Sequence, residues 1–119
     1  MIKAIVLAIT VLLMNACAVQ APQRTISGPV GVLLAQADQH ATNGEISQAI
    51  ALLERAVRIE PRNGHAWLHL ARLHFDSGGF NKAEQFVQRA MQFAGDDKPL
   101  ERECQRLLDR VRSHKKRIG

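Results

Sequence analysis

The residues of this chain whose types and spacing come closest to a chemical site are histidines. His65 and His69 lie four residues apart, so on a helix both imidazoles share one face and could chelate a metal ion. The residues between them are Ala-Trp-Leu and include no glutamate, so the zinc-protease pattern is absent. We therefore expect these histidines to form a solvated face that binds no metal.

The segment after His74 contains the residue types of a hydrolytic triad. Asp76 and Ser77 follow His74 closely, but the segment is expected to be the turn that ends a helix, and nothing orders the three as nucleophile, base and orienting acid. The sequence has no phosphate-cradling glycine run, no Cys-x-x-Cys pair and no Gly-x-Ser-x-Gly motif. We predict that the chain is not an enzyme and needs no cofactor.

The two cysteines lie in different contexts. Cys17 follows a start that is typical of a secretory signal peptide, with Lys3 ahead of an apolar stretch at residues 4–14. As a helix this stretch spans about 16 Å, too short to cross a bilayer, which needs about 20 residues. Cys104 instead lies on a helical apolar stripe with Leu100 and Leu107. We expect Cys104 to be buried as a small hydrophobic residue, with an intermolecular disulfide as the alternative.

The residues that end the apolar stretch, Leu13-Met14-Asn15-Ala16-Cys17, resemble the lipobox of bacterial lipoproteins. That resemblance implies that residues 1–16 are a cleaved signal peptide and that Cys17 is lipidated and becomes the mature N-terminus. The alternative is an ordinary signal peptide with an incidental Cys. Residues 17–28 lack apolar periodicity and read as a flexible tether. Ala18 stands where inner-membrane lipoproteins of enterobacteria have Asp, which implies attachment to the periplasmic face of the outer membrane.

Composition limits what the remainder can be. The chain has 119 residues, of which 46% are hydrophobic, 8 are Gly and 4 are Pro, and its net charge is +5. That is room for one domain, and it excludes a large multidomain enzyme, a β-rich secreted scaffold and a polytopic membrane protein. Residues 114–119 form a basic tail. The export signal argues against nucleic acid as its partner, and leaves anionic lipid headgroups, an acidic protein surface or a merely solubilising end.

The chain repeats itself with a period of 34 residues. Shifting it by 34 residues superposes identical residues at seven positions between 30 and 61, where chance would give roughly two. The identical pairs are Leu34/Leu68, Ala37/Ala71, His40/His74, Gly44/Gly78, Ala49/Ala83, Arg55/Arg89 and Ala56/Ala90. Apolar residues recur at helical spacing in both copies. We predict five helices, near residues 30–42, 46–59, 64–76, 80–93 and 98–113.

The period and its residues resemble the tetratricopeptide repeat, a helix–turn–helix unit. In the second copy the signature positions hold Trp67, Leu70, Ala71, Gly78, Phe80, Ala83 and Ala90. The resemblance implies an all-α fold, with two repeats and a C-terminal capping helix in residues 29–113. Stacked repeats usually need about three units, so we also predict marginal stability, or stabilisation by a partner or by self-association into a homo-oligomer.

In that family the first helix of each pair lines a concave groove that binds peptides. Carried over by position, the groove would contain Leu34, Asp38, His65, Leu68, Arg72, Phe75 and Asp76, joined by Arg102 and Arg106 of the cap. The resemblance implies an apolar strip of Leu34, Leu68 and Phe75 flanked by arginines, suited to a peptide with apolar anchors and acidic flanks. A merely solvated polar face is the alternative.

The lipobox and the repeats together resemble the small outer-membrane tetratricopeptide lipoproteins. Some of these activate penicillin-binding proteins that polymerise peptidoglycan, and others act as pilotins for pilus secretins. The resemblance implies a lipid-anchored, periplasmic interaction adaptor whose partner is a protein of the cell envelope. A pilotin-like assembly factor, or a cytosolic scaffold with an uncleaved N-terminus, is the alternative.

Overall fold

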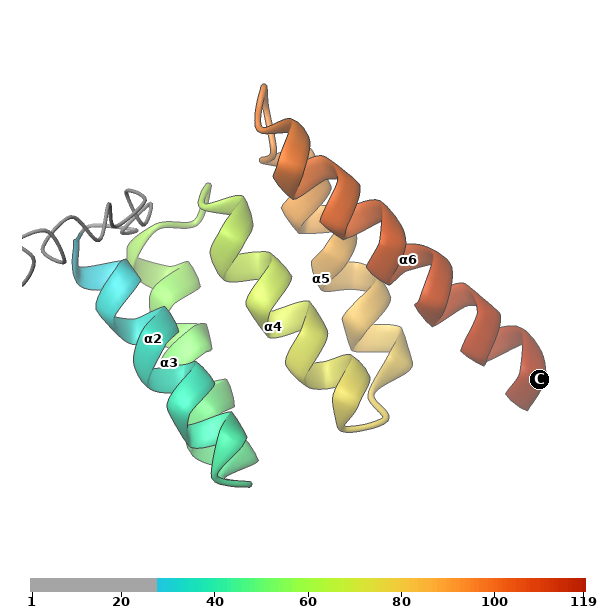
Figure 1. Ribbon diagram of the computed structural model, residues 1–119, viewed down its shortest axis with the longest axis horizontal. Helices are drawn as coiled ribbons and strands as arrows, with labels where there is room; N and C mark the ends of the chain where they lie inside the picture. The colour runs from blue at the N-terminus through green and yellow to red at the C-terminus, as the bar shows by residue number, and fades with distance from the viewer. Residues whose placement is uncertain (1–27) are drawn as a thin grey trace, which may run out of the picture.

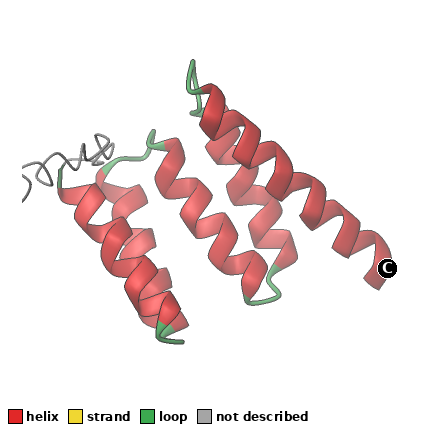
Figure 2. Cartoon of the chain, in the orientation of Figure 1, coloured by secondary structure: helices red, strands yellow, loops and turns green. Residues whose placement is uncertain are grey.

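The computed structural model describes residues 28–119, which form five α-helices without a strand among them (Figures 1 and 2). The helices are α2 (Pro29–Thr42), α3 (Ile46–Ile59), α4 (Gly64–Asp76), α5 (Phe80–Gln92) and α6 (Lys98–Ile118). The predicted signal peptide, Cys17 and nearly all of the tether lie outside the described residues. The first four helices agree with the sequence prediction to within one residue at either end.

The helices are arranged in two layers of a short stack. α2 packs against α3 and α4 packs against α5, so each 34-residue unit is one antiparallel helix pair. The first helices of the pairs are neighbours along one side of the stack, where α2, α4 and α6 lie in front of α3 and α5 in Figure 1. α6 packs against both α4 and α5 and closes the stack.

Small residues allow the helix pairs to approach closely. Ala37, Ala49, Ala71 and Ala83 are fully or almost fully buried, as the repeat pattern predicts. The buried residues form two clusters, one within α2, α3 and α4 and the other within α4, α5 and α6. The half-buried ring of Trp67 packs against both clusters, so it joins the two parts of the core.

The helix ends follow from a few residues with special conformations. Gly44 and Gly78 have φ values of 79° and 81°, in the left-handed region where a side chain would be strained. The Asn63 side chain caps α4 by accepting a hydrogen bond from the Ala66 N–H at 3.2 Å, and Asp97 caps α6 in the same way through the Leu100 N–H.

α6 is longer than the sequence pattern predicts. We expected a helix that ends near residue 113, followed by a separate basic tail, but the helix continues to Ile118. The apolar stripe ends at Val111, yet the last turns still make contacts: the His114 ring packs against Phe75 and Phe80, and Lys115 pairs with Glu84 on α5 at 2.5 Å. Most of the basic tail is therefore helical. None of the helices described here combines the length and the apolar character that crossing a membrane requires.

Candidate functional site

A groove lies between α2 and α4, on the side of the stack formed by the first helices. Its volume is about 180 Å³, and its lining consists of small and apolar residues at the floor with polar residues at the edges. The lining residues are Ala37, Asp38, Ala41, Leu53, His69, Arg72, Leu73 and Asp76. Three of the residues predicted from the sequence, Asp38, Arg72 and Asp76, are therefore brought together here.

A difference between the two repeats explains why the groove lies at this position. Ala41 of α2 and Phe75 of α4 are equivalent residues, 34 positions apart. Ala41 leaves space in front of Leu53, whereas the Phe75 ring packs edge-on against Phe80 and is covered by the Arg110 guanidinium, 4.6 Å from its centroid. The equivalent space in the second repeat is therefore filled by the protein's own side chains.

The predicted apolar strip is not available on the surface, and this prediction was wrong. Leu34 and Leu68 are each 2% exposed, and Phe75 is 8% exposed. Leu34 belongs to the core cluster of the first repeat, and Leu68 and Phe75 belong to the cluster that α6 covers. With only two repeats and a cap, these side chains are needed to fill the spaces between neighbouring helices, so the face they were expected to line is mainly polar.

A histidine–carboxylate hydrogen bond and an ion pair connect the first helices across this face. Asp38 on α2 pairs with His69 on α4, with 3.0 Å between Oδ1 and Nδ1, and Arg72 on α4 pairs with Glu103 on α6. Asp38 and Arg72 are equivalent residues of the two repeats. The same position therefore links α2 to α4 through a carboxylate and α4 to α6 through a guanidinium. The guanidinium of Arg72 is thus already engaged, which sequence reasoning missed because its partner lies 31 residues away.

The other predicted residues lie outside the groove lining. His65 Nε2 lies 2.9 Å from Asp97 Oδ2, which links the start of α4 to the turn before α6. Arg102 and Arg106 are exposed on α6. The side chain of neither arginine makes a hydrogen bond or an ion pair within residues 28–119.

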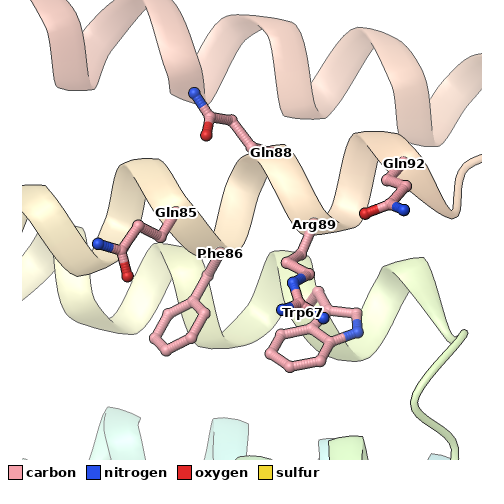
Figure 3. Close-up of a pocket in the computed structure, with 6 residues that line it drawn as sticks. All are labelled: Trp67, Gln85, Phe86, Gln88, Arg89 and Gln92. Atoms are coloured by element: carbon pink, nitrogen blue, oxygen red, sulfur yellow. The ribbon is translucent and has the colours of Figure 1, made fainter.

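A second pocket, of about 430 Å³, lies over α4 and α5 (Figure 3). Its walls are Trp67, Gln85, Phe86, Gln88, Arg89 and Gln92. The rings of Trp67 and Phe86 stack with their centroids 5.7 Å apart, and the Arg89 guanidinium lies 5.4 Å from the Trp67 ring. From the sequence, Trp67 was recognised only as a signature residue of the repeat. The signal available for this pocket was the three glutamines at i, i+3 and i+7 beside an aromatic residue.

Burial determines the two clearest pKa shifts. Burial of His74, with a smaller contribution from nearby Lys82, lowers the pKa of its imidazole below 6.5, so this side chain in the last turn of α4 is neutral at pH 7. Burial raises the pKa of the Cys104 thiol to about 11. Cys104 is a free, fully buried residue of the core, as expected from its apolar stripe. In residues 28–119 no three His, Cys, Asp or Glu side chains gather in a way that could hold a metal ion.

Comparison with known proteins identifies the class to which this stack belongs. The family model described as the tetratricopeptide repeat matches residues 40–108, so the chain belongs to the tetratricopeptide-repeat family. The fold is accordingly two such repeats closed by a capping helix, a scaffold for protein–protein interaction.

A particular solved structure is similar over most of the chain. The globular C-terminal domain of P. aeruginosa LpoP is 32% identical, with a TM-score of 0.71, over 74% of this chain and 83% of that one. No curated protein matches the chain.

Proposed function

We propose that this protein is a lipid-anchored adaptor of the bacterial cell envelope, which docks a segment of a partner protein in the groove between α2 and α4. The partner we propose is a peptidoglycan synthase of the penicillin-binding class. The observation that carries the proposal is the groove itself, which exists because Ala41 replaces the Phe found at the equivalent place in the second repeat. The similarity to the LpoP domain, together with the lipobox-like segment, supports an envelope setting.

The chemistry of the groove favours a polypeptide over a small metabolite. Ala37 and Ala41 give it a shallow, nonpolar floor, and Asp38, His69 and Asp76 provide acceptors and donors along its edge. An extended or helical segment can place a small apolar side chain on such a floor, while its backbone N–H groups bond to the carboxylates. The binding we propose is therefore modest in area and depends on the shape of the floor.

The N-terminal segment supplies the anchor in this proposal. Lipidation of Cys17 after removal of residues 1–16 would hold the repeat domain at the membrane, on a tether that reaches at most about 40 Å when fully extended. Intact mass of the protein extracted from membranes tests this step. Acylated Cys17 as the first residue supports it, whereas an intact Met1 would support the cytosolic scaffold instead.

The groove is tested by filling it. Ala41→Phe gives the first repeat the residue of the second, and should weaken capture of the periplasmic part of a bifunctional penicillin-binding protein about tenfold, equivalent to about 1.4 kcal/mol. Gln39→Phe, an exposed position on the same helix outside the groove, is the matched control and should bind as the unchanged protein does. Equal binding by both variants, with helical content preserved, would overturn the groove assignment. Groove-dependent binding to a pilus secretin and not to the synthase would point to the pilotin function.

A further inference from the structure

The net charge of this chain is concentrated in one helix. Residues 1–97 carry eight Lys or Arg and eight Asp or Glu, whereas α6 carries eight and three. The whole formal charge of +5 therefore lies on α6. A helix at the end of the stack with such an excess creates a local positive potential, while the body of the molecule is neutral overall.

The three acidic residues of α6 are each engaged, Asp109 by a hydrogen bond from Gln105 Nε2 at 3.1 Å, and they leave an excess of five positive charges on the helix. Glu103 is engaged by Arg72 of α4, and Glu101 pairs with Lys98 in the first turn. On the side facing α5, Arg112 and Lys115 both pair with Glu84. Within residues 28–119, this leaves the side chains of Arg102, Arg106, Lys116 and Arg117 without an ion pair or a hydrogen bond, and Arg110 with only the Phe75 ring beside its guanidinium.

Four arginines form a row along α6, which we term the arginine stripe: Arg102, Arg106, Arg110 and Arg117. Their separations of four, four and seven residues place them on one face of the helix. The row is about 22 Å long, at 1.5 Å of rise per residue. The Arg110 guanidinium lies over the Phe75 ring of α4, so the stripe approaches α4 at this residue. In Figure 1, α6 lies beside α4 on the side of the stack that the first helices form.

We infer that the arginine stripe binds an acidic segment of the partner polypeptide, beside the groove. This inference rests on the proposed function, which makes the partner a protein. It adds that the segment bound by the stripe is acidic. Each guanidinium can bind a carboxylate with two parallel hydrogen bonds. The first three arginines of the stripe follow one another at a rise of about 6 Å, and Arg117 lies about 10 Å further along. Alternate residues of an extended peptide are about 6.6 Å apart, so alternating carboxylates match the row.

Three other occupants fit the stripe less well. Residues 1–27 contain no Asp or Glu, so the chain's own N-terminal segment has no carboxylate side chain to offer. A second copy would bring its own positive α6 against the first, which disfavours an interface between two copies of this helix. A membrane-surface helix needs an apolar face beside its basic one, but the only strongly exposed large hydrophobic residue on α6 is Ile118, at its very end.

The test uses the full chain in a neutral detergent and a fluorescently labelled peptide of alternating Glu and Ser, with a Gln–Ser peptide for comparison. Binding is followed by fluorescence anisotropy in low salt. We expect the Glu peptide to bind and the Gln peptide not to bind, and we expect about 0.3 M salt to weaken binding strongly. Arg102→Glu with Arg106→Glu should weaken it about tenfold or more, because it reverses two charges of the stripe at exposed positions that the core does not need.

The chain offers a matched control for this change. Arg55→Glu with Arg58→Glu reverses the same number of charges at exposed positions of α3, and should alter binding less than about twofold. Equal loss in both double variants would show that only net charge matters, and would overturn the stripe. Stripe-dependent binding to vesicles containing anionic lipid, without binding to the Glu peptide, would also overturn it in favour of a lipid surface.

These results are separable from the test of the proposed function. If the Ala41→Phe variant still captures the synthase while the stripe variant loses the acidic peptide, the groove assignment fails and the stripe stands. If the groove variant loses the synthase and the stripe variant binds the Glu peptide as the unchanged protein does, the stripe inference alone fails.

Discussion

The two repeats share a backbone plan but treat equivalent residues differently. His40 in the first repeat and His74 in the second occupy the same position, four residues before Gly44 and Gly78 respectively. The His40 side chain is 38% exposed and pairs with Glu45, just after its turn. His74 is only 9% exposed, and its ring packs against Phe86 with the centroids 5.3 Å apart.

The residue after the turn distinguishes the two histidines. The equivalent of Glu45 is Gly79, and a Cβ at Gly79 would lie 3.3 Å from His74 Nδ1. Glycine thus leaves the space that the buried imidazole fills, whereas Glu45 offers a carboxylate that holds His40 near the surface. The repeat with Glu45 at this position has an exposed, paired histidine. The repeat with Gly79 there has a buried, neutral one.

The first residues of the repeats also differ, and we expect a substitution there to have the largest effect on stability. Val30 begins the first repeat as a buried residue, whereas its equivalent, Gly64, sits where a Cβ would lie 2.8 Å from Leu100 Cδ2 and 3.0 Å from the Ala90 carbonyl oxygen. Gly64→Val should therefore destabilise the domain by about 3 kcal/mol, because backbone on α5 must move. Urea unfolding followed by circular dichroism measures this.

A graded control accompanies that substitution. Gly64→Ala adds only the first carbon of the side chain, so its cost should be smaller than that of Val. A Gly64→Val protein as stable as the original would show that α6 does not press on the start of α4, and the two repeats would then be interchangeable at this position.

The contrast between the histidines predicts a pH dependence of intermediate size. The pKa of His74 is lowered from its ordinary value of 6.5 by burial, so below pH 6.5 the unfolded chain binds a proton that the folded protein excludes. Stability should fall as the pH falls from 6.5 toward the folded pKa of His74, with a slope from this group no steeper than about 1.4 kcal/mol per pH unit. Urea unfolding between pH 7.5 and 5 gives the slope.

Replacing each histidine in turn shows which of the two causes the slope of stability against pH. His74→Gln should flatten the acid side of the curve, whereas His40→Gln removes an exposed imidazole and should leave the contribution of His74 in place. The comparison of the repeats is contradicted if the His40 variant flattens the curve and the His74 variant does not.

The smallest expected effect concerns two equivalent polar pairs, Asp38–His69 and Arg72–Glu103. Both pairs are at least partly exposed, so a double-mutant cycle with Arg72→Ala and Glu103→Ala should give a coupling energy of only about 0.2–1 kcal/mol. Unfolding in about 1 M salt should remove most of it. A coupling well above this range would mean that the pairs, rather than the apolar clusters, hold the first helices together.

The sequence predicted the helices well because their signals are local. Apolar spacing, the turn glycines and the capping Asn63 each act within one helix or one turn, so each could be recognised without knowing what packs against it. The end of α6 was not predicted for the opposite reason. Its last turns are stabilised by contacts of Lys115 and His114, whose partners Glu84 and Phe75 lie on other helices.

The groove was predicted only in part. Asp38, Arg72 and Asp76 were placed correctly on one face, because the side of a helix follows from residue number. The pairing of Arg72 with Glu103 and the pocket beside Trp67 and Phe86 were not predicted, because each joins residues about 20 to 30 positions apart. Such contacts depend on the crossing of whole helices.

By itself, the 34-residue period determined that this chain forms paired helices, since small alanines and turn glycines at fixed spacing permit few other packings. Tertiary structure alone decided that Leu34, Leu68 and Phe75 are core, and that the side chains of Arg102 and Arg106 find no ion-pair partner among residues 28–119. Burial and ion pairing are properties of two surfaces in contact, and an amphipathic pattern describes only one of them.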